Sequence, residues 1–261
     1  MSKVVVVTGG TRGIGLGLVR ELTARQAQVV FCGRSADGVA RAQDAVPGAV
    51  GVVADVTDRA ALHRLWDTAV ERFGRVDIWI NNAGRTASRR PLWQLDPADL
   101  KETVDLNVTA LLNASAVALA GMIGQGSGAL WNMEGLGSDG RHQPGLTTYG
   151  ATKRAVTYVT DGLAREIAQA GVPEVTVHHL SPGMVVTDLL IHDYSPQELA
   201  RVKKIFNILA DRVETVTPWL ADKVLAGAPH GARVAWLTRG KVLLRFATAF
   251  RGRDVFGEPA A

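Results

Sequence analysis

Cysteine is nearly absent from this sequence: Cys32 is the only one among 261 residues. A single thiol excludes an internal disulfide and any cysteine-rich metal site, so we expect Cys32 to be buried and inert and expect no zinc. Long apolar runs are also scarce, and we expect none to approach the roughly 20 residues of a transmembrane helix. The chain enters a strand-like run at Lys3, which leaves no room for a signal peptide before it. We therefore expect a cytoplasmic protein.

What the sequence does contain is the composition of an ordinary globular protein. Apolar residues make up 47% and charged residues 21% of the chain. A length of 261 residues suits a single α/β domain covering 1–261. The formal net charge is +4, but the basic residues are mostly dispersed, without a nucleic-acid recognition motif or an array of stacking aromatics. Nucleic acid is therefore not an expected partner.

Short β-branched runs alternate with helix-length amphipathic stretches along the chain. Strands are expected at 4–8, 28–32, 50–54, 76–80, 128–132, 175–180 and 233–237, and helices at about 14–25, 37–46, 58–73, 97–121, 148–170 and 187–223. This alternation predicts an α/β fold: a doubly wound, Rossmann-type sheet of seven parallel strands, covered on both faces. Residues 187–213 follow the sixth strand as an insertion. Because ligands bind beyond the carboxyl ends of such strands, we expect this insertion to be a helical substrate lid.

Glycines gather directly after the first predicted strand, in Thr8-Gly9-Gly10-Thr11-Arg12-Gly13-Ile14-Gly15. Gly9 and Gly13 allow tight turning, and Gly15 allows the following helix to pack closely on the strand. The amino end of that helix offers free N–H groups and a positive dipole end to a pyrophosphate. We therefore expect this loop to bind a dinucleotide through residues that include Thr11, Arg12 and Ile14.

The end of the second predicted strand indicates which dinucleotide is used. An NAD enzyme places an acid there on the ribose 2′-hydroxyl, but this chain has Gly33 followed by Arg34. Arg34 and Arg12 could clamp a 2′-phosphate, which favours NADPH/NADP. After the third strand, Asp55 and Val56 are placed to contact the adenine, although capping of a helix by a nearby Asp or Thr is an alternative for this segment.

A tyrosine and a lysine supply the candidate acid–base chemistry. Tyr149 and Lys153 lie four residues apart at the start of a predicted helix and so share one face of it. The ammonium can lower the pKa of the phenol, which would let Tyr149 protonate a developing alkoxide. The spacing alone carries little weight, but it gains weight from the glycine loop upstream.

Together with Asn81-Asn82-Ala83-Gly84 after the fourth strand, these motifs resemble the short-chain dehydrogenase/reductase (SDR) superfamily, which has the TGxxxGxG glycine spacing. The resemblance implies carbonyl reduction by hydride transfer, with Lys153 also holding the nicotinamide ribose. It implies that Asn107 orders a water in the proton relay, and that the chain forms a homo-oligomer through its two long helices. It further implies cofactor contacts from Asn82, Ala83, Gly84, Pro182, Gly183, Val185 and Thr187.

One position departs from the SDR pattern. The family usually has a serine thirteen residues before its tyrosine, and that position here is Leu136, in a loop with one extra residue. Ser138 could substitute from a rearranged loop, or Tyr149 could hold the substrate carbonyl alone.

Four segments resemble the chlorophyll b reductase branch of the superfamily: 132–141, 149–154, 181–190 and 206–210. This resemblance implies a role in chlorophyll catabolism, the reduction of the 7-formyl group of chlorophyll b to 7-hydroxymethyl. Another hydrophobic aldehyde, ketone or secondary alcohol is the alternative substrate. A non-catalytic NADP-binding regulator is a further alternative, against which the intact Tyr149, Lys153 and Asn107 argue.

The C-terminal extension, residues 239–261, combines apolar and basic side chains in an amphipathic stretch. Packing onto its own domain, packing onto a second subunit and peripheral attachment to anionic lipid are the three interpretations.

Overall fold

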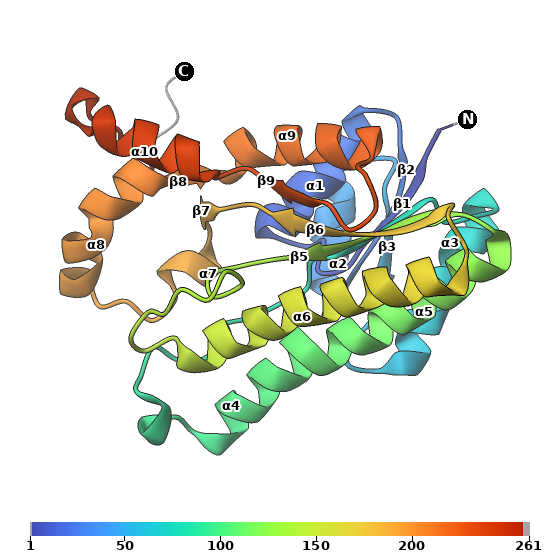
Figure 1. Cartoon of the computed structure of the whole chain (residues 1–261), viewed down its shortest axis with the longest axis horizontal. Helices are drawn as coiled ribbons and strands as arrows, with labels where there is room; N and C mark the ends of the chain where they lie inside the picture. The colour runs from blue at the N-terminus through green and yellow to red at the C-terminus, as the bar shows by residue number, and fades with distance from the viewer. Residues whose placement is uncertain (1, 258–261) are drawn as a thin grey trace.

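A seven-stranded parallel sheet forms the centre of the protein in the computed structural model, which describes residues 2–257 (Figure 1). Its strand order is β3-β2-β1-β4-β5-β6-β9, which confirms the expected doubly wound Rossmann-type sheet. The strands are β1 (Val4–Val7), β2 (Gln28–Gly33), β3 (Val50–Val53), β4 (Ile78–Asn81), β5 (Gly128–Met133), β6 (Val175–Ser181) and β9 (Arg233–Ala235).

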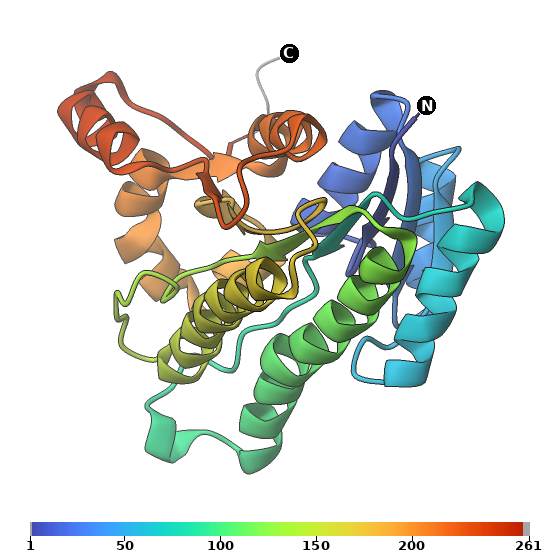
Figure 2. The same ribbon diagram turned by 45° about the vertical axis from the view of Figure 1, so that its right-hand side comes forward.

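Helices cover both faces of the sheet, as Figure 2 shows. One face carries α1 (Gly13–Ala24), α2 (Ala36–Ala45) and α9 (Val213–Ala226), and the other carries α3 (Arg59–Phe73), α5 (Ala110–Gln125) and α6 (Thr147–Ala170). The remaining helices are α4 (Pro97–Val104), α7 (Asp188–Ile191), α8 (Pro196–Leu209) and α10 (Arg239–Ala247), with short 3-10 turns at Leu92–Gln94 and Ala249–Arg251.

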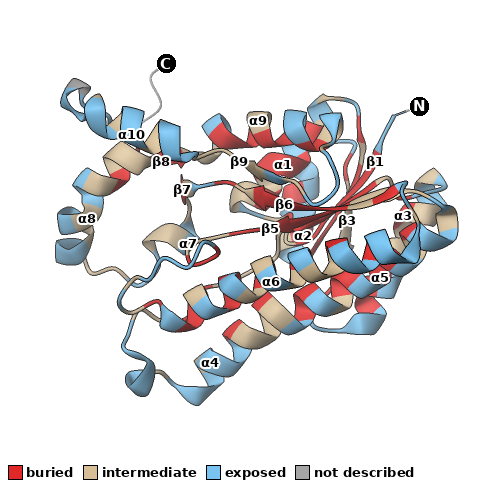
Figure 3. Ribbon diagram, viewed as in Figure 1, coloured by how far each residue is buried: buried red, intermediate tan, exposed pale blue. Residues whose placement is uncertain are grey.

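The alternation of side chains along β1 explains why the protein has two main hydrophobic cores. Val4 and Val6 point into the core under α3 and α5, while Val5 and Val7 point into the core under α1 and α9. All four valines are buried, which accounts for the continuous apolar run in the sequence (Figure 3).

The helix expected over 97–121 is divided in the structure. A π-helical turn, Asp105–Thr109, separates α4 from α5. An 18-residue window within Pro97–Gln125 makes this stretch apolar enough to cross a membrane by length and composition alone, so the expectation that no apolar run approaches that length was wrong. Half of this window is buried inside the protein, where α5 packs against α3 and the sheet, as a core helix does.

The segment expected as a helical insertion, residues 187–213, is bordered by a small two-stranded sheet. Strand β7 (Met184–Val186) pairs in parallel with β8 (Ala210–Arg212), and α7 and α8 lie between them in the chain. Phe206 of α8 anchors a third hydrophobic cluster with Ala210 and Val255. The two strands are too short to stand out in the sequence, and their pairing depends on the contact made in the folded chain.

A buried carboxylate ties the C-terminal extension to β8. Asp211 accepts hydrogen bonds from Trp236 Nε1, Arg245 and Arg253, each at 2.6 Å. Two of the basic residues of the extension are therefore bound to its own domain, and residues 258–261 of the extension lie outside the described part. The outward side of α10 still exposes Leu243 and Leu244.

Candidate active site

The glycine loop after β1 forms a cradle that side chains would fill. A Cβ at Gly9 would come within 2.9 Å of Ala83 Cα, and one at Gly15 within 2.1 Å of Gly9 O. Gly9 and Gly13 also have positive φ angles of 65° and 53°. No described side chain caps the amino end of α1, and its first turn contains no acidic residue. The loop therefore leaves room and free N–H groups for an anionic group, and these residues fit a pyrophosphate.

The asparagine motif after β4 supports this loop from the side. Asn82 Nδ2 donates to Thr8 O at 3.0 Å and to Gly9 O at 3.1 Å, while the backbone N–H groups of Asn82 and Ala83 donate to Thr8 Oγ1. Asn82 thus fixes the turn on which the glycines lie. Ile14 packs against the core beneath α1.

The opposite end of the cradle bears on the choice of cofactor. A Cβ at Gly33 would lie 2.4 Å from Thr11 Cγ2, so an aspartate at this position would displace Thr11. Arg34 is exposed beside it, and Arg12 makes only a solvent-exposed ion pair of 3.7 Å with Asp188. Both guanidinium groups are thus available to a 2′-phosphate.

Asp55 is engaged locally in the structure. Its Oδ1 accepts hydrogen bonds from Thr57 N and Thr57 Oγ1, and the neighbouring Asp58 caps α3 through Ala60 N. Val56 is buried. The local capping weighed for this segment is therefore present, and contact of Asp55 and Val56 with an adenine stays a prediction.

The segment after β6 faces the glycine loop. A Cβ at Gly13 would lie 3.4 Å from Thr187 Cγ2, so Thr187 stands opposite the amino end of α1. Between β6 and Thr187 in the chain, Gly183 has a φ of 73° and Val185 is buried. Pro182 precedes that turn. This arrangement fits the nicotinamide end of a dinucleotide bound along the same edge of the sheet.

Tyr149 and Lys153 converge on Gly135, which directly follows Glu134 at the end of β5. A Cβ at Gly135 would lie 2.4 Å from the Tyr149 hydroxyl oxygen and 3.1 Å from Lys153 Cε. Lys153 Nζ donates to Met133 O at 3.1 Å. The two side chains expected from the sequence to act together therefore lie at one point, beyond the carboxyl end of β5.

Burial dominates the electrostatics of this pair. It raises the pKa of the Tyr149 phenol above its usual value and lowers the pKa of Lys153 to about 8, although the charge of Glu134 opposes the latter shift. Burial accounts for the raised pKa of the Tyr149 phenol, so the expected lowering of that pKa by Lys153 is not met in this structure. Tyr149 is protonated at neutral pH, which is the form that a proton donor requires.

Asn107 lies in the π-helical turn, next to the same pair. Its Oδ1 accepts from Arg85 N at 2.9 Å, and its Nδ2 donates to Arg85 O and Thr152 Oγ1. Gly84 separates it from the lysine, since a Cβ there would lie 3.3 Å from Asn107 Oδ1 and 3.7 Å from Lys153 Nζ. The structure therefore brings Asn107 to the site, through a helical distortion common at functional sites.

Ser138 does not point at the tyrosine. It is buried, its Oγ donates to Lys153 O at 3.1 Å and accepts from Gly135 N at 3.1 Å. Substitution for the family serine by Ser138 thus conflicts with the structure, because its hydroxyl holds the loop to α6. The position facing the Tyr149 hydroxyl is occupied by Gly135, which has no side chain.

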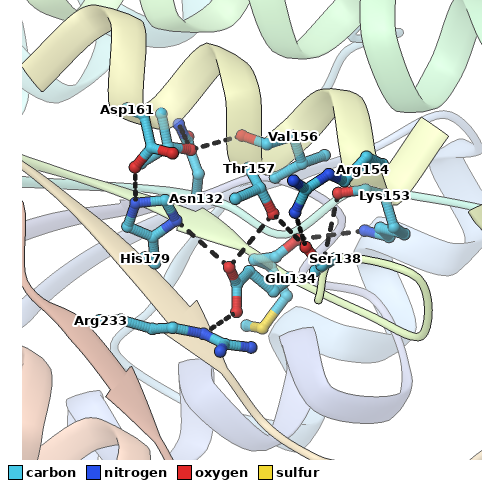
Figure 4. Close-up of polar contacts among 12 residues, drawn as sticks. Asn132, Glu134, Ser138, Lys153, Arg154, Val156, Thr157, Asp161, His179 and Arg233 are labelled. Atoms are coloured by element: carbon cyan, nitrogen blue, oxygen red, sulfur yellow. Dashed lines mark hydrogen bonds and ion pairs between the residues drawn. The ribbon is translucent and has the colours of Figure 1, made fainter. Parts of the chain in front are cut away.

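A cluster of buried charge lies behind this loop (Figure 4). The Glu134 side chain is 1% exposed and makes contacts of 2.6 Å with Arg233 Nε and 3.2 Å with His179 Nδ1. The other ring nitrogen of His179 lies 3.0 Å from Asp161 Oδ1. Burial alone would raise the pKa of Glu134, but the contacts from His179 and Arg233 outweigh it and lower that pKa. The carboxylate is therefore ionised and fixes the residue that precedes Gly135.

Sequence reasoning missed this cluster. His178 and His179 both lie in β6, and His178 is a packing residue whose ring centroid lies 4.3 Å from that of Trp131. His179 instead joins the charged group. The acid within 132–141 was the available signal, since a carboxylate at the end of a buried strand needs a partner. Cys32 is buried, and burial raises its pKa to about 11, which fits the expected inert thiol.

The fold and the site together define a class of protein. Residues 3–198 match the family of short chain dehydrogenases, and the chain belongs to that family. It is an SDR oxidoreductase with a Tyr149–Lys153 pair beside a dinucleotide cradle.

Within the family, the chain is similar to chlorophyll(ide) b reductases. It is 37% identical to the chloroplastic chlorophyll(ide) b reductase NOL of Arabidopsis thaliana, covering 87% of this chain and 67% of that protein. It is 32% identical to the probable chloroplastic chlorophyll(ide) b reductase NYC1 of Oryza sativa subsp. japonica, covering 95% of this chain and 53% of that protein. The chain thus spans about two thirds of one relative and about half of the other. The fold matches a 3-ketoacyl-(acyl-carrier-protein) reductase of Brucella melitensis, complexed with NADH, with a TM-score of 0.77, 24% identity and coverage of 90% and 96%.

Proposed function

We propose that this protein reduces the 7-formyl group of chlorophyll b, or of a closely related macrocycle, to a hydroxymethyl group with NADPH. The observation that carries the proposal is the convergence of Tyr149 and Lys153 on Gly135, a glycine that faces the Tyr149 hydroxyl. The likeness to chlorophyll(ide) b reductases supports the choice of substrate.

The chain's own residues account for the proton transfer. The bound nicotinamide supplies the hydride. Tyr149, protonated at neutral pH, donates its proton to the oxygen that becomes the alcohol. Lys153 holds positive charge beside it, and Asn107 keeps the adjacent turn in place through Arg85 and Thr152. With the hydroxyl of Ser138 bound to the backbone, Tyr149 is the group that holds the carbonyl.

The preference for NADPH rests on two features of the second strand's end. Thr11 occupies the space that the acid of an NAD enzyme would need, and Arg34 and Arg12 lie exposed nearby. Replacing Arg34 with alanine should raise the KM for NADPH about tenfold and leave that for NADH unchanged, because a charge-assisted phosphate contact is worth about 1.5 kcal/mol.

Segment 187–213 fits a substrate lid, because α7 and α8 lie beyond the carboxyl ends of β5 and β6 (Figure 1).

The exposed Leu243 and Leu244 of α10 favour contact with an apolar surface such as a membrane, although Arg245 is engaged with Asp211. Flotation with anionic vesicles tests this second point: binding of the full chain but not of a truncation ending at Thr238 supports it, and binding of neither rejects it. A cytoplasmic location, peripheral to a membrane, stays a prediction.

The reaction is tested by incubating chlorophyll b in detergent with NADPH and either wild-type protein or Tyr149→Phe, followed by absorbance and HPLC. We expect 7-hydroxymethyl chlorophyll a from the wild type alone, with a loss of at least about 10²-fold in the variant. A wild type that binds NADPH but makes no product would reject the pigment. A panel of hydrophobic aldehydes, ketones and secondary alcohols would then identify the substrate.

A further inference from the structure

Within residues 2–257 the guanidinium group of Arg89 forms no ion pair, and Arg89 lies at the junction of three segments around the substrate side of the site. The loop after β4 carries it, the loop before α6 contributes Gly145, and the turn before α8 contributes Tyr194. A Cβ at Gly145 would lie 3.2 Å from Arg89 Cγ, four residues before Tyr149. Figure 1 shows the loops before α6 and α8 on the side of the sheet beyond the carboxyl ends of β5 and β6.

The guanidinium group of Arg89 is partly desolvated and unsatisfied. Its Nε is buried without a hydrogen-bond partner, and among residues 2–257 no carboxylate lies within ion-pair distance of it. Burial lowers the pKa of Arg89 below its usual value. Other half-buried arginines are paired: Arg85 contacts Asp99, and Arg245 contacts Asp211. A half-buried cation without an anion is costly, which makes this position suited to an anion from outside the chain.

The two acids nearest to Arg89 are occupied elsewhere. Asp193 Oδ2 accepts the backbone N–H of Arg89 at 2.8 Å. Glu198 is held by Ser195, whose N–H and hydroxyl both donate to its Oε2. Neither carboxylate therefore forms an ion pair with the guanidinium group of Arg89, although the negative charge of both attracts it.

The position of the guanidinium is fixed by an aromatic platform. Its Cζ lies 3.9 Å from the centre of the Tyr194 ring, and that ring packs edge-on against Phe206 at 5.9 Å. Asp193 adopts a positive φ of 61°, a conformation that an aspartate takes only at some cost, and the hydrogen bond from Arg89 N holds it there. A guanidinium fixed on a ring keeps its planar edge free for a bidentate anion.

We infer that Arg89 binds a carboxylate on the substrate, remote from the carbonyl that is reduced. The inference rests on the proposed reduction of a chlorophyll-type macrocycle, and it names the acid rather than the ester as the preferred form. In that macrocycle the 7-formyl group and the propionate side chain lie on opposite rings. An anchor on the lid side of the site, away from Tyr149, suits this geometry and orients the formyl group towards the proton donor.

The test compares chlorophyllide b with its methyl ester, which differ only in the free carboxylate. Equilibrium dissociation constants are measured by fluorescence quenching on the NADP-loaded full chain. The wild type should bind the acid at least about tenfold more tightly than the ester, and Arg89→Met should bring this ratio close to one. Arg89→Lys, which keeps the charge but loses the planar guanidinium that binds a carboxylate through two hydrogen bonds, should have a ratio between these two values. Arg90→Met, a change of the exposed neighbour, should keep the wild-type ratio.

Two results would overturn the inference. One is a wild type that does not prefer the acid. The other is an Arg89→Met variant whose affinity for the acid and for the ester falls equally. That result would mean that Arg89 acts only by its contact with Tyr194, which would affect both ligands alike. Turnover is followed separately. If the acid is preferred through Arg89 but neither pigment is reduced, the proposed reaction fails while the carboxylate site stands.

Discussion

At the scale of single residues, Gly135 decides how Tyr149 works. The phenol oxygen lies close to where a Cβ of residue 135 would be, and the hydroxyl of Ser138 is used to hold the loop. The site therefore depends on the absence of a side chain at Gly135.

We predict that Gly135→Ser lowers activity instead of restoring a family feature. Its Cβ would lie 2.4 Å from the Tyr149 oxygen, so the buried ring must move. A displacement of about 1 Å can lower the turnover rate by about 10²-fold. The measurement is kcat for carbonyl reduction alongside the dissociation constant of NADPH, with Gly124→Ser as the control because a Cβ there meets nothing within 4 Å and its φ is not positive. Full activity in Gly135→Ser would show that the space is not needed.

The charge on Lys153 predicts a pH dependence. Burial lowers its pKa to about 8, so the ammonium is present below that pH and lost above it. The rate of reduction should therefore fall as the pH rises through about 8. Since Glu134 raises this pKa, Glu134→Gln should move the fall to lower pH by roughly one unit or less. Asp161→Asn, which changes an exposed acid of the same cluster, should leave the profile in place. Identical profiles for wild type and Glu134→Gln would contradict this assignment.

At the scale of elements, the joint between β8 and the C-terminal extension depends on one carboxylate. Asp211 is 3% exposed in its side chain and contacts both Arg245 and Arg253. Burial alone would raise its pKa, but the hydrogen bonds from Trp236 and Arg245 and the arginine charges lower it.

We predict that Asp211→Asn lowers the free energy of unfolding by about 2–4 kcal/mol at pH 7, because it leaves two arginines without their buried counter-charge. Because folding lowers the pKa of Asp211, the stabilisation by its carboxylate is fully present above the pKa of the unfolded state, about 3.9. This stabilisation is lost as the pH falls through the pKa of the folded state. Urea titration at pH 7 and near pH 3 measures the difference, which should narrow in acid. Asp254→Asn, which changes an exposed acid on the same segment, should alter the free energy of unfolding little. Equal losses of stability in the two variants would argue against a special role for Asp211.

At the scale of the whole molecule, the outer surfaces of α5 and α6 remain uncovered. Leu112 on α5 and Tyr158 on α6 are 46% and 81% exposed. Apolar side chains on two neighbouring long helices favour a helix-to-helix contact with a second copy.

We predict that the chain in solution has at least twice the mass of one copy, and that Leu112→Glu combined with Tyr158→Glu makes it a monomer. Light scattering after size exclusion measures the mass. Val53→Glu, which replaces an exposed valine of the edge strand β3, should leave the assembly intact. A monomeric wild type would remove the expected homo-oligomer.

The sequence by itself determined the parallel sheet, the dinucleotide loop and the Tyr149–Lys153 pair. These depend on local patterns: β-branched runs, glycines at fixed spacing, and two residues on one face of a helix. Asn107 was also found from its motif, although the π-helical turn that carries it was not.

Only the tertiary structure decided what joins distant segments. The pairing of β7 with β8, the charged contacts of Glu134 with His179 and Arg233, and the approach of Gly135 to Tyr149 each bring together residues that no local pattern relates. It also reversed the expected pKa of Tyr149 and assigned the hydroxyl of Ser138 to the backbone. The physical reason is that burial and three-dimensional proximity, which set desolvation and hydrogen bonding, arise only when the chain is packed.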